Sequence, residues 1–188
     1  MMLALLMTLE AATAQPASDA DFDPDTGYRI AHYRGVIPHP PEGISHIAVD
    51  EVAKLHAVLI DVTPAEGAVR DPTTGRWRLA EPHQSIPGAH WFPEAGRGRL
   101  EPDIERWFLS GVERLAGRHP DKPIVVFCLA DCWMSWNASL RLRRAGFPHV
   151  RWFAEGIDGW RESGRVVRFV QPNRDETGNL KNQSQRRN

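Results

Sequence analysis

The sequence predicts an α/β domain with a central, mainly parallel sheet flanked by helices. Apolar runs of strand length alternate with helical patterns along the chain, which is the order of strand–helix–strand units. The runs at 57–62 and 123–128 are almost continuously apolar, as in parallel strands that helices cover on both faces. A length of 188 residues, with 41% hydrophobic and 25% charged residues, suits one domain with tails.

The individual elements follow from periodicity and from the residues that start and stop them. Pro102 and Gly117 bound one amphipathic helix, and Gly146 ends another at the C-cap position. In chain order we expect a strand within 44–49, a short helix over 51–55 that Asp50 caps, a strand over 57–62, a small hairpin arm at 76–79, a turn and strand over 85–93, a helix over 101–117, a strand over 123–128, an amphipathic helix over 133–145, a strand over 149–153 and a turn into a last short helix over 155–160.

Three segments flank this domain, which we place at 44–170. Residues 1–14 have the pattern of a signal peptide, an apolar run and then an A-x-A site, so we expect export to the periplasm. No basic residue precedes that run, and a disordered or helical tail is the alternative. Residues 15–43 are polar and proline-rich, which predicts an extended N-terminal arm rather than a core element. Residues 171–188 are polar, which predicts a disordered tail.

Composition excludes several classes of function. The formal net charge of -1 predicts no general attraction to nucleic acid or to an anionic membrane. Beyond the N-terminal run, nothing approaches the roughly 18 apolar residues of a membrane span, so we expect none after signal removal. The eight histidines show no metal-ligand spacing with the cysteines, so we expect no metal and no cofactor.

Both cysteines of the chain lie between a predicted strand and a predicted helix. Cys128 ends the strand, and Cys132 lies four residues further on. A helix N-terminus favours an anion and therefore lowers the pKa of a nearby thiol. We interpret Cys128 as a nucleophile, with packing as a small buried hydrophobe as the alternative. A disulfide across so short a loop stabilises a fold little, so the pair suits chemistry better than stapling.

Four motifs resemble the rhodanese-like family, in the same order, over about 44–167. They are Leu59-Ile60-Asp61-Val62, the turn Ser85-Ile86-Pro87-Gly88-Ala89-His90, the strand 123–128, and Glu155-Gly156-Ile157-Asp158-Gly159-Trp160. The string 128–137 is similar to the subfamily named for a CXXCW motif and for catabolism dependent on pyrroloquinoline quinone (PQQ), here with three residues between the cysteines. The resemblance implies that Cys128 carries sulfane sulfur as a persulfide. It also implies that the protein is exported and is encoded near a quinoprotein dehydrogenase and its cytochrome.

The loop after Cys128 differs from that of thiosulfate-cleaving rhodaneses, which carry Arg or Lys there. Asp131 adds a negative charge that raises the pKa of the thiol and repels a dianion. Thiosulfate is therefore not the donor we expect. Met134 stands where related phosphatases place an arginine, which excludes phosphatase activity. The residues expected to line the substrate loop are Leu129, Ala130, Asp131, Trp133, Met134 and Ser135.

Cys132 has no counterpart in a simple rhodanese. We interpret it as a second thiol that attacks a persulfide or mixed disulfide on Cys128. Cu(I) held by Cys128, Cys132 and Met134 ranks lower, because only one methionine is left after signal removal and no histidine lies in the loop. Packing at the helix start is the structural alternative.

Further side chains surround the two thiols in the sequence. Trp133 is interpreted as a lid or a shelf for a partner, and Trp136 as packing between helix and sheet. Ser135 would cap the helix or bind the thiolate, and Asp61 would organise the turn after its strand rather than react. The arginines expected on a solvated helix face are Arg141, Arg143 and Arg144.

Together these features predict an exported sulfurtransferase, or a persulfide or thiol–disulfide carrier, that acts on a sulfane donor or a protein thiol. The alternative is a non-catalytic rhodanese-fold module that docks a quinoprotein dehydrogenase or cytochrome through the tryptophan-rich loop. The missing loop cations favour the module, and the paired cysteines favour chemistry.

Overall fold

The computed structural model describes residues 18–174. The predicted signal at 1–14 and positions 175–188 of the predicted tail lie outside the described residues. In chain order the elements are η1 (Asp19–Asp21), β1 (Ser45–His46), α1 (Val49–Val52), β2 (Val58–Asp61), β3 (Val69–Arg70), β4 (Trp77–Arg78), β5 (His83–Ser85), β6 (His90–Trp91), α2 (Pro102–Gly117), β7 (Ile124–Phe127), α3 (Trp133–Arg144), β8 (Val150–Phe153), α4 (Gly156–Glu162) and β9 (Arg168–Val170).

A five-stranded parallel sheet in the order β1-β8-β7-β2-β6 forms the centre, which confirms the predicted fold class. The central strand β7 pairs with β2 and β8 and is buried along its whole length. Asp61 lies opposite Phe127 on one side and Trp91 on the other. The carboxyl ends of these three strands therefore meet at one edge of the sheet, where open α/β folds bind their ligands.

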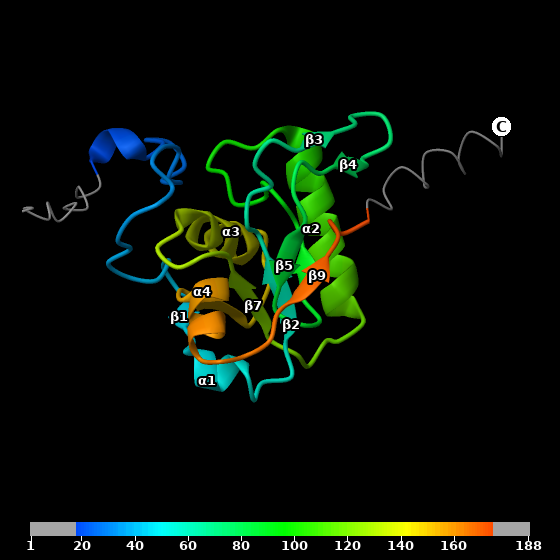
Figure 1. The fold of residues 1–188 in the computed structure, drawn as a ribbon. Helices are drawn as coiled ribbons and strands as arrows, with labels where there is room; N and C mark the ends of the chain where they lie inside the picture. Colours follow the sequence, from blue (N-terminus) through cyan, green and yellow to red (C-terminus); the bar gives the residue numbers. More distant parts are fainter. Residues whose placement is uncertain (1–17, 175–188) are drawn as a thin grey trace, which may run out of the picture.

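Helices cover both faces of the sheet, as Figure 1 shows. Ile124 and Val126 of β7 face the core cluster that contains the apolar residues of α2 and α3. Val125 and Phe127 face the other cluster, on the side of α1 and α4, which lie side by side in Figure 1. Successive residues of a strand point to opposite faces of the sheet, so alternate residues of β7 pack into different core clusters.

Two small antiparallel pairs lie outside the main sheet. The pair of β3 and β4 confirms the predicted hairpin arm. The pair of β5 and β9 joins residues 83–85 to the end of the domain. The sequence patterns did not predict this pair. Helix α1 begins at Val49 with Ala48 as its N-cap, so the prediction that Asp50 caps it is wrong.

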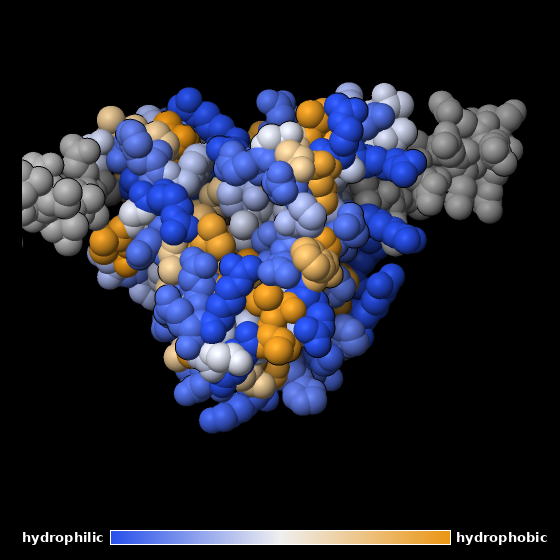
Figure 2. Space-filling model, viewed as in Figure 1, coloured by the Kyte–Doolittle hydropathy of each residue, from blue (hydrophilic) through white to orange (hydrophobic). Residues whose placement is uncertain are grey.

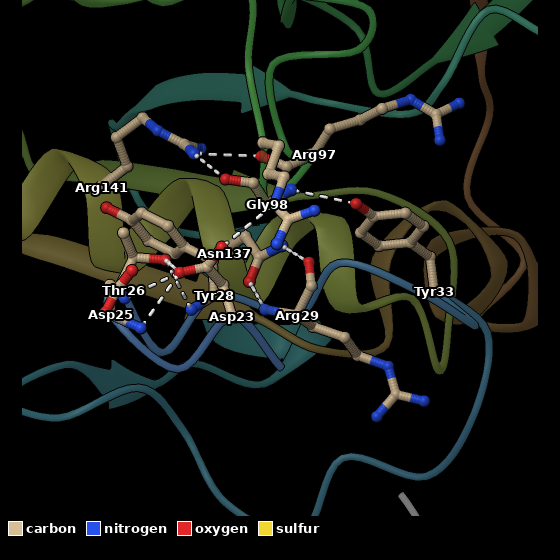
Figure 3. A network of polar contacts seen from close by, with 11 residues as sticks. Asp23, Asp25, Thr26, Tyr28, Arg29, Tyr33, Arg97, Gly98, Asn137 and Arg141 are labelled. Atoms are coloured by element: carbon tan, nitrogen blue, oxygen red, sulfur yellow. Dashed lines mark hydrogen bonds and ion pairs between the residues drawn. The ribbon is translucent and has the colours of Figure 1, made fainter. Parts of the chain in front are cut away.

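The N-terminal arm belongs to the core in its described part, so the expectation that it stays outside is wrong. Tyr28 is buried in the main cluster, and the Arg141 guanidinium lies over its ring, 4.4 Å from the centroid. Asn137 accepts a hydrogen bond from the Arg29 N–H (2.9 Å) and donates one to the Arg29 carbonyl oxygen (2.8 Å) (Figure 3). The arm therefore crosses the outer side of α3.

Burial of α3 follows from this crossing. All of residues 133–142 are buried, so the prediction of an amphipathic helix is wrong. The sheet covers one side of the helix, and the arm covers polar residues that would otherwise meet water. By contrast α2 has one buried stripe, as its sequence predicts.

Figure 2 shows hydrophobic side chains in small patches separated by hydrophilic ones on the face viewed. This face presents no broad apolar surface of the kind that marks an obligate interface. Within 18–174, no helix has the length and apolar character needed to cross a bilayer.

Candidate functional site

The two cysteines lie at the carboxyl edge of the sheet, one at each end of a short loop. Cys128 follows β7 directly, and Cys132 is the N-cap residue of α3. Both are free thiols, with 0% of Cys128 and 2% of Cys132 exposed to solvent. The thiol of Cys128 donates a hydrogen bond to the carbonyl oxygen of Cys132 at 3.3 Å. The predicted strand–loop–helix arrangement is therefore present, and both of its thiols are shielded from solvent.

The start of α4 supports the loop from one side. The N–H of Ile157 donates to the Cys128 carbonyl oxygen at 2.8 Å, and the Ala130 N–H donates to the Asp158 carboxylate at 3.0 Å. Gly156 has a φ of 55°, and a Cβ there would lie 2.1 Å from the Cys128 carbonyl oxygen. Glycine is therefore required twice over, by its backbone angle and by the close approach.

The arm covers the loop from the other side with a short antiparallel bridge between Arg34 and Cys132. Gly35 N–H donates to the Asp131 carbonyl oxygen, and Trp133 N–H donates to the Tyr33 carbonyl oxygen, both at 2.8 Å. We refer to residues 33–35 as the strap. Because Trp133 is the first residue of α3, the strap occupies an N–H that the helix start would otherwise offer to an anion.

The environments of the two thiols push their pKa values in opposite directions. Burial raises the pKa of the Cys128 thiol well above its usual value, and its hydrogen bond with Cys132 raises it further. A hydrogen bond from the Cys128 thiol lowers the pKa of Cys132, assisted by the backbone of Met134 and the positive charge of Arg34. Burial opposes this decrease. Of the two thiols, Cys132 is therefore the one that ionises more readily.

Ser135 links the thiols to the sheet. Its hydroxyl donates to the Cys132 carbonyl oxygen at 3.1 Å and accepts a hydrogen bond from the Trp152 indole N–H at 3.0 Å. Its hydroxyl and backbone also lie within hydrogen-bonding reach of the Cys128 sulfur, where they favour the thiolate. Of the two roles considered for Ser135, contact with the thiol agrees with this geometry, and α3 has no side-chain N-cap bond.

The rhodanese-like domain family matches residues 47–163, more than half of the chain. The chain belongs to this family. Its solved relatives include a thiosulfate sulfurtransferase from Pseudomonas aeruginosa, with 24% identity, a TM-score of 0.42, and coverage of 70% of this chain and 21% of that one. A full-length protein from Lactobacillus plantarum has 20% identity, a TM-score of 0.41, and coverage of 66% and 88%.

A third similar solved structure is that of the Tum1 protein from Saccharomyces cerevisiae, with 19% identity, a TM-score of 0.42, and coverage of 70% of this chain and 47% of that one. The chain thus spans about a fifth of the Pseudomonas protein and about half of Tum1. No curated protein matches it.

The other loop residues of this rhodanese-like domain are placed as follows. Asp131 is exposed in a left-handed conformation, with a φ of 50°, and Met134 is buried. Trp133 and Trp136 are both buried, so the interpretation of Trp133 as a shelf for a partner is wrong. The Arg29 guanidinium lies 4.7 Å from the Trp133 ring, and the Trp136 indole donates to His39 O at 3.0 Å. The arm therefore takes the place of a partner.

Asp61 lies at the end of β2 and is completely buried. One carboxylate oxygen accepts the Thr63 N–H at 2.8 Å, which is the predicted turn-capping contact. The other accepts hydrogen bonds from Ser85 (2.6 Å) and from His83 (2.7 Å). These contacts fix β5 to the carboxyl end of β2. Asp61 therefore supports the edge of the sheet on which the thiol loop stands.

Several residues that complete the rhodanese-like site escaped the sequence analysis. Arg141 was expected in a solvated face, but it is buried and donates to three carbonyl oxygens, so that expectation is wrong for it. Asn137, one helical turn earlier, is also buried, and polar residues four apart on one helix face were the available signal. Arg34 and Asp158 gave none, because only the fold brings them to the loop. No group of three or more metal-ligating side chains occurs among residues 18–174.

Proposed function

We propose that this rhodanese-like protein carries sulfane sulfur, or exchanges disulfides, through Cys128 and Cys132. The observation that carries the proposal is the pair of free thiols at the start of α3, where the Cys128 thiol donates to the Cys132 carbonyl oxygen. A thiolate attacks a sulfur–sulfur bond, and a second thiol within reach can take over the sulfur or close a disulfide.

The donor that fits best is a persulfide on a small thiol or on a protein, rather than thiosulfate. The segment 128–136 contains no lysine or arginine. Two N–H groups at the loop are already engaged, that of Ala130 with the Asp158 carboxylate and that of Trp133 with the strap. A dianion would therefore meet a carboxylate and occupied donors where other loops offer positive charge.

We further propose that the protein is exported and serves PQQ-dependent alcohol oxidation. The support is the signal-like pattern of residues 1–14 and the likeness of the string 128–137 to the CXXCW subfamily. A quinoprotein dehydrogenase or a cytochrome would then be the partner.

Intact mass spectrometry after exposure to an organic persulfide tests the chemistry. We expect the natural chain to gain one sulfur atom, or to lose two hydrogens through a disulfide. Cys128→Ser and Cys132→Ser should each be unable to form the disulfide. The double variant is the control and should gain nothing. Failure of the natural chain to show either change would refute the proposal.

The alternative, a non-catalytic binding module, has one observation in its favour, the burial of both thiols. A module predicts that partner binding survives in the double serine variant and that the natural chain takes up no sulfur. The same mass measurement therefore separates the two functions.

A further inference from the structure

The order in which the two thiols act can be inferred from what surrounds each sulfur. The family resemblance gives the first attack to Cys128, because it ends the strand. That residue is completely buried, and its thiol donates a hydrogen bond to the carbonyl oxygen of Cys132. Cys128 is also within hydrogen-bonding distance of the Leu129 carbonyl oxygen, at 3.6 Å. These contacts favour a neutral thiol, since a thiolate cannot donate, and together with burial they outweigh the Ser135 hydroxyl and backbone, which favour the thiolate.

Cys132 has the opposite surroundings. It is the N-cap residue of the twelve-residue helix α3, and the Cys128 thiol and the backbone of Met134 and Leu129 act to lower the pKa of its thiol. Its backbone pairs with Arg34 of the strap, which is exposed and places a positive charge close to the sulfur. Donors, a helix N-terminus and a cation all favour an anion here.

We propose that Cys132 is the thiolate that attacks first, that Cys128 keeps the proton beneath it, and that Arg34 of the arm supplies the positive charge missing from the loop. This assignment rests on the proposed function and reverses the order that the family resemblance implies. It also makes Arg34 a positioning residue, whose side chain acts on the sulfur from a different part of the chain.

The step balances without a further reactant. The Cys132 thiolate attacks the terminal sulfur of an organic persulfide, and a new S–S bond forms on Cys132. The S–S bond of the donor breaks, and its electron pair leaves with the donor as a thiolate, which takes up a proton from water. Because both thiols are buried, the strap has to move aside before the donor enters.

Other charged groups around the loop affect the same equilibrium. Asp131 in the loop opposes ionisation, and Asp158 on α4 is occupied by the Ala130 N–H. The Arg29 guanidinium is also engaged, since it donates to Asp21 and to two carbonyl oxygens while it lies over Trp133. Arg34 has no such partner in the described part of the chain. A substitution there removes its charge without breaking other side-chain hydrogen bonds.

Titration of the thiolate absorbance in the ultraviolet tests the assignment, because it does not require a reagent to enter. In Cys128→Ser, where a hydroxyl can still donate to Cys132, the midpoint should fall below the ordinary cysteine value of about 8.5. In Cys132→Ser the midpoint should lie above it. The reverse order would overturn the proposal. Adding Arg34→Gln to Cys128→Ser should raise the midpoint, and Arg34→Lys should restore it.

A second measurement uses the unmutated chain. After limiting iodoacetamide at neutral pH, peptide mapping should place more label on Cys132 than on Cys128, since the thiolate is the form that reacts. Equal or reversed labelling would overturn the order of attack. If the titration gives the expected order but no persulfide forms, the proposed function fails and the ionisation assignment stands.

Discussion

Asn137→Ala should destabilise the protein by about 4 kcal/mol, because it leaves three buried backbone groups without partners. Its side chain accepts the Arg29 N–H and donates to the carbonyl oxygens of Arg29 and Gly96. Each unsatisfied buried group costs about 1–3 kcal/mol. The free energy of unfolding from urea titration measures the loss. Because Asn137 holds the arm, native-state alkylation of the thiols should also become faster.

Ser139→Ala is the matched control for this change. Ser139 lies on the same helix, is fully buried, and its hydroxyl has no hydrogen-bond partner within residues 18–174. Its removal leaves no new group unsatisfied, so stability should change by less than about 0.5 kcal/mol. Similar losses in the two variants would show that the arm contacts of Asn137 carry no special weight.

Gly156→Ala should cost about 3 kcal/mol and disturb the thiol loop. The new Cβ would lie within 3.0 Å of backbone atoms of Cys128 and Leu129, which cannot rotate away as a side chain can. Alanine also resists the φ of 55°, at a cost of roughly 1–2 kcal/mol, and the overlap adds about as much again. Denaturant unfolding should show the loss, and the ultraviolet midpoint of the thiols should shift because α4 can no longer hold Cys128.

Gly164→Ala separates the two contributions. Gly164 has a φ of 76°, yet a Cβ there would meet no atom within 4 Å. This variant carries the backbone cost alone, about 1 kcal/mol, and should leave the thiol titration unchanged. A loss as large in Gly164→Ala as in Gly156→Ala would contradict the role assigned to the close approach.

The strands and helices of the main domain were predictable because their signals are local. The apolar runs of β2 and β7, the Pro102 start of α2 and the Gly156 start of α4 each specify an element without reference to distant residues. The strand–loop–helix position of Cys128 follows from the same signals.

What could not be predicted depends on contacts between distant segments. The composition of a polar, proline-rich stretch such as 18–43 is typical of a solvent-exposed segment. It does not reveal that Asn137 donates to a carbonyl oxygen of this stretch or that Arg141 packs on one of its aromatic rings. The same polar residues made α3 look amphipathic. Arg34 is more than 90 positions from Cys132 in the sequence, and no spacing rule connects them. The electrostatics of the thiol pair were therefore unpredictable even though its location was clear.

Because the arm crosses α3, the boundary of the family match differs from the boundary of the folded unit, although the two usually coincide. The family match begins at residue 47, whereas Tyr28 and Arg29 complete the packing around α3, which lies inside that match. We expect a fragment of 47–163 to expose the buried polar and aromatic side of α3 and to be recovered largely as aggregate, while 18–174 is recovered as folded protein. The part of the chain that a family comparison recognises is then smaller than the part that folds as a unit.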